Sequence, residues 1–109
     1  MDNQTFQPKS LDVTDINGAH QAVPDINVFG NGDQFQLLCK ASSQMQGWMK
    51  STKAMEVGGV GCVVQVSTQQ RNNDGSYALA EAVCFVPGVR IAGDATNGRW
   101  LERHLEWKP

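Results

Sequence analysis

The sequence lacks several features that would assign the chain to a familiar functional class. No apolar run approaches the roughly 20 residues that a membrane-spanning helix requires. Residues 1–8 have neither a basic start nor an apolar stretch, so we expect no signal peptide and a cytoplasmic location. Nine basic and eleven acidic residues give a net charge of −2, without the Lys and Arg excess of most nucleic-acid-binding domains. General binding of nucleic acid is therefore not expected.

Metal-binding and catalytic patterns are also missing. The three cysteines, Cys39, Cys62 and Cys84, have no CxxC spacing and fall on expected strands, so we predict buried, reduced thiols rather than a zinc site. The stretch 12–18 has some of the spacing of a calcium-binding loop, but Val13 occupies the first ligand position. We expect no bound metal and no cofactor.

The sequence has no GxSxG, HExxH, Walker or dinucleotide-binding motif. A cysteine beside His20 or His104 would be the remaining candidate for a nucleophile and its base. A reactive thiolate needs a polar, accessible setting, whereas Cys62 and Cys84 lie among Val, Ala and Phe. We therefore expect a protein that is not an enzyme.

A β-hairpin signature is the strongest positive feature. The strand-like runs 61–70 and 76–86 flank the turn-forming stretch 71–75. Pairing Gln70 with Ser76 predicts one wholly apolar or small face, on which Cys62 lies opposite Cys84. The alanines on that face leave room for a large neighbour such as a tryptophan.

A second hairpin is predicted over residues 34–57. The run 34–42 alternates, with Phe35, Leu37, Cys39 and Ala41 on one face. Residues 45–55 fit either a strand after a turn at 43–47 or a helix with an apolar face. We favour the strand because Gly47 inside a helix costs about 1 kcal/mol relative to Ala.

The ends of the chain are less regular. Residues 1–32 are polar and acidic, and we predict an extended, partly mobile arm with one short edge strand at 24–29. Residues 33–109 form the single domain, with a further strand at 89–92 and a segment at 99–107 that fits a strand or a helix. The predicted fold is all-β, or β-dominated α+β: a small antiparallel barrel or sandwich of five to six short strands.

One basic-aromatic cluster is the candidate ligand-binding site, formed by Lys40, Trp48, Lys50 and Lys53. Such a cluster can stack a base or hold a small anionic ligand. The alternative is that Trp48 packs over the alanines while the lysines stay solvated, and the charge balance favours this alternative.

The residues and the order of three segments, 47–57, 61–70 and 80–89, resemble those of small uncharacterised proteins of tailed bacteriophages, over about residues 40–91. The resemblance implies a phage-encoded protein that acts in the bacterial cytoplasm or in the virion, and it implies no catalytic residue. Three functions follow as hypotheses: a binding or regulatory protein that acts on a host protein, a structural virion or assembly component, and a small-ligand or single-strand binder.

Self-association is the last expectation. The strands at 61–70 and 76–86 carry apolar residues on both faces, and a chain of 109 residues has little material to cover both. Because large exposed apolar patches are rare on monomers, we expect a homo-oligomer. The alternative to a second copy is that the C-terminal segment covers the second apolar face, with Trp100, Leu101, Leu105 and Trp107.

Overall fold

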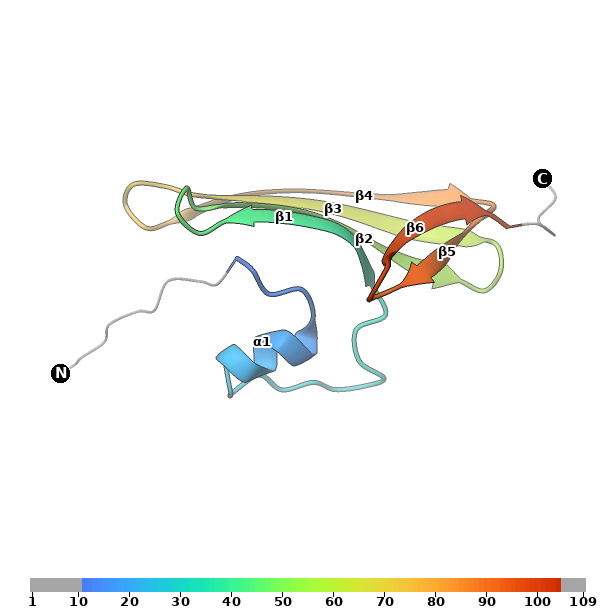
Figure 1. Cartoon of the computed structure of the whole chain (residues 1–109), viewed down its shortest axis with the longest axis horizontal. Helices are drawn as coiled ribbons and strands as arrows, with labels where there is room; N and C mark the ends of the chain where they lie inside the picture. The colour runs from blue at the N-terminus through green and yellow to red at the C-terminus, as the bar shows by residue number, and fades with distance from the viewer. Residues whose placement is uncertain (1–10, 105–109) are drawn as a thin grey trace.

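The structure, a computed structural model, describes residues 11–104 and consists mainly of antiparallel strands (Figure 1). One sheet has four strands in the order β1-β2-β3-β4, and the other pairs β5 with β6. This confirms the strand-dominated fold class. The four-stranded sheet stays open, so the predicted barrel or sandwich is not confirmed. In chain order the elements are α1 (Ile16–Ala22), β1 (Gln36–Ser43), β2 (Trp48–Val57), β3 (Gly61–Arg71), β4 (Tyr77–Pro87), β5 (Val89–Asp94) and β6 (Gly98–Arg103).

The first hairpin, β1–β2, settles the ambiguous stretch in favour of a strand. Trp48–Val57 is β2, and it pairs along its whole length with β3 without a register shift. Gly47 makes the preceding turn possible because it adopts a φ of +73°, a conformation that side chains disfavour. The pairing leaves the even-numbered residues of β2 on one face of the sheet and the odd-numbered residues on the other.

A bulge in β1 breaks the predicted alternation of that strand. Leu37 pairs with Lys53, whereas Cys39 pairs with Thr52, so the strand contains one extra residue at this point. Leu37 and Cys39 therefore lie on opposite faces. The prediction that they share a face was wrong because a bulge shifts every later side chain by one position.

The register of the β3–β4 hairpin also differs from the prediction. Arg71 pairs with Tyr77, which places the five-residue loop at 72–76, one position later than expected. Asp74 fixes the loop there, because its Oδ1 accepts hydrogen bonds from both the N–H and the hydroxyl group of Ser76. Because both ends of the loop move by one residue, each residue of β3 pairs with a β4 residue two positions later than predicted. Residues two positions apart lie on the same face of a strand, so the predicted faces are retained. Cys62 consequently lies opposite Val86 and not opposite Cys84.

The N-terminal segment lies against the odd face of the sheet (Figure 1). The Ser42 hydroxyl donates to Asp12 Oδ1 at 2.5 Å, and Lys40 Nζ donates to the Val13 carbonyl oxygen. Leu11 is only 2% exposed. Further along this segment, Ile16–Ala22 is α1, and residues 24–29 are not in a strand. The predicted edge strand at 24–29 was therefore wrong. The division into an arm and a domain at residue 32 stays a prediction.

The β5–β6 hairpin covers the even face at the other end of the sheet. Ile91 N–H donates to Glu56 Oε2 at 2.8 Å, and the Cys62 thiol lies 3.6 Å from the Val89 carbonyl oxygen. Below this hairpin Ala54 and Cys62 are fully buried. The strand prediction at 89–92 is confirmed. Of the ambiguous C-terminal segment 99–107, residues 99–103 lie in a strand, which begins at Gly98. Leu105 and Trp107 lie outside the described residues.

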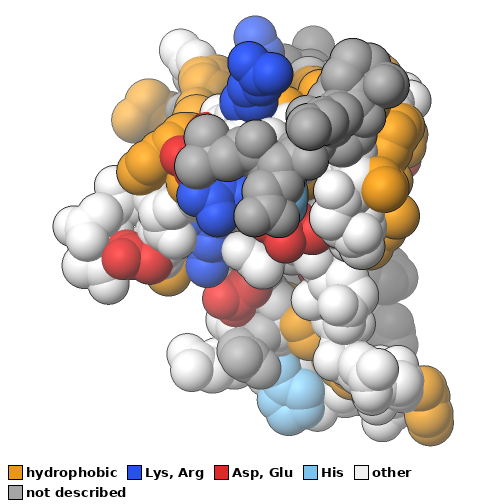
Figure 2. All heavy atoms as spheres, turned by 90° about the vertical axis from the view of Figure 1, so that its right-hand side faces the viewer, with side chains coloured by type: hydrophobic (Ala, Val, Ile, Leu, Met, Phe, Trp, Pro, Cys, Tyr) orange, Lys and Arg blue, Asp and Glu red, His pale blue; other side chains and the backbone are white. Residues whose placement is uncertain are grey.

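The buried apolar core is small. Among the described residues, the buried hydrophobic side chains are Leu11, Met49, Ala54 and Cys62. Large apolar side chains are left exposed, and Figure 2 shows hydrophobic side chains at the surface on both sides of charged groups at one end of the molecule. The prediction of three buried cysteines was wrong for Cys39 and Cys84, which are exposed, because no described element covers the sheet at their positions.

Candidate functional site

The register of β2, β3 and β4 builds two rows of side chains across the even face. Trp48 pairs with Gln70, which pairs with Ala78, and these three form the first row. The second row consists of Lys50, Thr68 and Ala80. Each row runs from a large side chain on β2 through a polar side chain on β3 to an alanine on β4, so the face descends from β2 toward β4.

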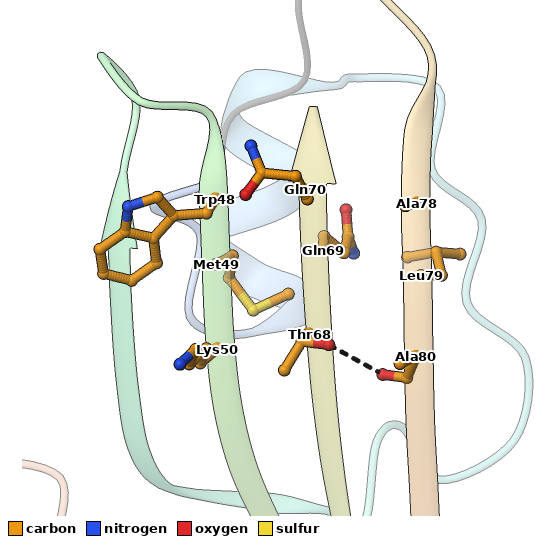
Figure 3. A pocket seen from close by; sticks show the side chains of 9 residues that line it. All are labelled: Trp48, Met49, Lys50, Thr68, Gln69, Gln70, Ala78, Leu79 and Ala80. Carbon is orange, nitrogen blue, oxygen red and sulfur yellow. Dashed lines mark hydrogen bonds between the residues drawn. The ribbon is translucent and has the colours of Figure 1, made fainter. Parts of the chain in front are cut away.

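This descent forms a hollow of about 480 Å³ over the three strands. Figure 3 shows its lining residues, with α1 behind the strands on the opposite face of the sheet. Thr68 Oγ1 lies 3.5 Å from the Ala80 carbonyl oxygen, which keeps the threonine side chain along the strands. The hollow combines apolar surface with a few hydrogen-bonding groups, a composition typical of binding sites.

Trp48 forms one side of the hollow and does not cover the alanines. Its ring extends over β1 (Figure 3), and its Nε1–H donates to Gln46 Oε1 at 2.7 Å. The neighbouring Gln70 side chain donates to the carbonyl oxygens of Gln46 and Arg71, at 3.4 and 3.1 Å. The indole is thus held at the rim by polar contacts, and Ala78, Ala80 and Ala82 stay exposed.

The structure separates the four residues of the predicted cluster. Trp48 and Lys50 share the even face, as expected. Lys40 pairs with Ser51 and reaches the N-terminal segment on the odd face, and Lys53 is also an odd-numbered residue of β2. Burial lowers the pKa of the Lys40 ammonium, with a further lowering from the positive charge of Lys53 and an opposing effect of Asp12. Lys40 therefore serves the packing of the N-terminal segment.

Sequence reasoning missed most of the residues that line the hollow. Gln70 and Thr68 were assigned to a strand, but nothing in the sequence shows that they lie beside Trp48 and Lys50. The alanines of β4 were recognised as a small-residue face, which was the available signal. The pairing of β2 with β3 brings the two sets together.

Cys62 lies at the opposite end of the same face, under the β5–β6 hairpin. Burial raises the pKa of its thiol, and the nearby negative charge of Glu56 raises it further. A buried thiol with a raised pKa is a poor nucleophile. Within residues 11–104, no group of three or more His, Cys, Asp or Glu side chains is placed to hold a metal ion. No helix in that range is long and apolar enough to cross a membrane.

The fold and the hollow define a class: a small strand-dominated protein with an open antiparallel sheet, whose even face the β5–β6 hairpin covers at one end only. The chain belongs to the Lockin family, whose model matches residues 6–102. The match includes every helix and nearly every strand residue described above. Neither a curated protein nor a solved structure matches the chain.

Proposed function

We propose that the protein is a non-enzymatic binding protein that docks a protein partner in the hollow on its even face. The observation that carries this proposal is the uncovered alanine surface of β4 beside the fixed indole of Trp48. Tryptophans at a concave surface are frequent centres of protein–protein interfaces, because they bury a large area with little loss of side-chain freedom. Thr68 and Gln70 supply hydrogen-bonding groups within the same surface.

The separation of the lysines supports a protein partner over a nucleotide or a single strand. Lys50 is the only one of the three predicted lysines on the face that carries Trp48, and the other two are odd-numbered side chains across the sheet. A strand-binding groove pairs stacking rings with several cations along the phosphate backbone. One lysine beside a row of alanines fits a protein surface better.

The resemblance to small phage proteins supports a search for the partner in a bacterial host. A protein that modulates a host protein needs a recognition surface and no reaction chemistry, which agrees with the motifs missing from the sequence. Detection of the chain in purified phage particles would instead favour the structural role.

The test compares two tryptophan variants. Trp48→Ala removes the rim of the hollow, whereas Trp100→Ala removes a tryptophan of β6 that is 52% exposed. A host protein captured by the wild type and then purified should bind Trp48→Ala at least about tenfold more weakly, a loss of about 1.4 kcal/mol. Trp100→Ala should bind like the wild type. Equal binding of all three proteins would refute the hollow as the docking site.

A second measurement separates the ligand-binding alternative. Oligonucleotides or nucleotides are titrated into a Trp100→Phe, Trp107→Phe background, in which Trp48 is the remaining tryptophan and is excited selectively at wavelengths that tyrosine does not absorb. The proposal predicts no quenching. Saturable quenching would replace the protein partner with a small ligand or a single strand.

A further inference from the structure

The two outer edges of the four-stranded sheet are built differently. At the β1 edge, a bulge interrupts the strand at Leu37–Cys39, and the Arg99 guanidinium donates to the Leu37 carbonyl oxygen at 3.4 Å. Bulges and covering side chains are common devices that prevent an edge from pairing with another strand. The β4 edge has neither device. β4 pairs with β3 from residue 77 to 87 without a bulge, and no described strand lies on its other side.

The hydrogen bonds at the two ends of the β3–β4 hairpin show which backbone groups point outward. Gly88 N–H donates to Val60 O at 2.9 Å, and Asn72 N–H donates to Ser76 O at 2.7 Å. Both bonds join even-numbered residues, and both pairs continue the register of the hairpin. Because hydrogen-bonded pairs alternate along an antiparallel ladder, all even-numbered residues of β4 point their backbone groups toward β3. The odd-numbered residues turn theirs away from the sheet. Pro87, which has no N–H to donate, is odd-numbered and fits this pattern.

The side chains along this edge are apolar and exposed. Leu79, Val83 and Phe85 are 60%, 63% and 49% exposed on the odd face. The alanines and Cys84 are exposed on the even face. Glu81 is the one charged residue of the strand, and it accepts a hydrogen bond from the Ser67 hydroxyl at 3.2 Å. A long, regular, apolar edge of this kind is a template for another strand.

We propose that the occupant of this edge is the β4 strand of a second copy of the chain. Two β4 strands paired antiparallel about a two-fold axis join the two four-stranded sheets into one continuous sheet. In both copies the N–H and C=O groups of the odd-numbered β4 residues point away from the sheet, so these groups face each other across the two-fold axis. The association also buries apolar side chains that the small core of a single chain leaves in water. This inference is independent of the proposed protein partner.

The length and the one charge of β4 together favour one register. With the two-fold axis at Ala82, Leu79 lies opposite Phe85 of the second copy, Glu81 opposite its Val83, and Ala80 opposite its Cys84. With the axis at Glu81, two glutamates lie directly opposite each other, which is unfavourable. The Ala82-centred register avoids that contact, and because Ala82 is the middle residue of Tyr77–Pro87 it pairs the two strands over their whole length. Even-numbered residues of both copies lie on the same side of the joined sheet. The two hollows then open on the same side of the joined sheet.

The first test measures mass by light scattering over a range of micromolar concentrations. The wild type should approach twice the chain mass of 11.9 kDa. Val83→Pro removes an outward N–H, and Val83→Lys places a charge at the edge, so both variants should have the monomer mass while circular dichroism shows an unchanged strand content. Val57→Lys makes the same change at an exposed valine on β2 and should stay dimeric. A monomeric wild type, or a folded Val83→Pro that stays dimeric, overturns the proposal.

The second test reads the register in a Cys39→Ser, Cys84→Ser background. In this register Ala82 of one copy lies opposite Ala82 of the other, at a non-hydrogen-bonded position. Cα atoms at such positions are about 4.5 Å apart, and a disulfide can bridge this separation. Ala82→Cys should therefore form a covalent dimer on mild oxidation. Ala78→Cys, which faces Val86 of the second copy, should not. The reverse result, or equal cross-linking of both variants, contradicts the Ala82-centred register.

Discussion

The Arg71 side chain fills the space that a side chain at Gly47 would need. Arg71 N–H donates to the Gly47 carbonyl oxygen at 2.6 Å, and the Arg71 guanidinium donates to the Gln44 carbonyl oxygen at 2.9 Å. A Cβ atom at Gly47 would lie 2.8 Å from Arg71 Cβ. The end of β3 is thus locked to the β1–β2 turn, and this contact holds the rim of the hollow, because Trp48 follows Gly47 directly.

A matched pair of glycine substitutions measures this contact. Gly47 and Gly75 both have positive φ, +73° and +86°, but no atom lies within 4 Å of a Cβ built on Gly75. Gly75→Ala should lower the free energy of unfolding by about 1 kcal/mol from backbone strain alone. Gly47→Ala should lower it by about 1–3 kcal/mol more, because the added methyl displaces Arg71. Urea unfolding of both variants gives the comparison, and equal losses would show that Arg71 adapts freely.

Thiol labelling should separate the three cysteines. Cys62 is fully buried and burial raises the pKa of its thiol, so the nucleophilic thiolate is scarce at neutral pH. Cys39 and Cys84 are exposed. In the native protein, iodoacetamide should modify Cys39 and Cys84 quickly and Cys62 only on unfolding, as read by peptide mass spectrometry. Fast modification of Cys62 in the folded protein would show that the β5–β6 hairpin does not cover it.

Glu56 should control how firmly that hairpin is held. Its carboxylate accepts from Ile91 N–H at 2.8 Å, a charge-assisted hydrogen bond. Glu56→Ala removes the acceptor, so the Ile91 amide should exchange with deuterium faster and Cys62 should be labelled faster. Glu102→Ala is the control, because it removes the partner of Arg90 within the hairpin, 2.6 Å away, and leaves the bond between Glu56 and Ile91 in place. Unchanged exchange at Ile91 in Glu56→Ala would show that the hairpin is held by other contacts.

Asp74 in the β3–β4 loop should make the free energy of unfolding depend on pH in the acidic range. Hydrogen bonds from the Ser76 side chain and backbone lower the pKa of Asp74 from its ordinary value of 3.8. A carboxyl with a lowered folded pKa stabilises the fold above its unfolded pKa, and this contribution is lost as the pH falls through the folded value. Asp74→Asn keeps an acceptor oxygen without the titration, so its stability should change less than that of the wild type below about pH 4. Parallel slopes in urea unfolding across this range would refute the role of Asp74.

Alternation of residue types predicted the faces of the strands better than their partners. In the β3–β4 hairpin the stretch Asn72–Gly75 offers several turn formers, and any of them could have started the loop. The choice is made by Asp74 and Ser76, whose hydrogen bonds form only once the loop has closed. The faces survived because the loop moved as a unit, while the neighbour of Cys62 changed from Cys84 to Val86.

Lys40 left the candidate cluster for a different reason. Lys40 belongs to a strand with a bulge, and one extra residue decides on which face a side chain emerges. No residue type marks that bulge in the sequence. The N-terminal segment was similarly hard to place, because the docking of Leu11 depends on long-range contacts with the odd face of the sheet. Spaced apolar residues show that a segment can dock, but not where.

The small core of the chain has a thermodynamic consequence. Within residues 11–104, few apolar side chains are fully buried, so unfolding of this part newly hydrates little buried apolar surface. Newly hydrated apolar surface is the main source of the heat capacity of unfolding. The single chain should therefore have a lower heat-capacity increment than the usual value of about 12–15 cal/mol/K per residue. Its stability then varies only gently with temperature, and the strand hydrogen bonds carry a larger share of the folding enthalpy than in a protein with a deep core.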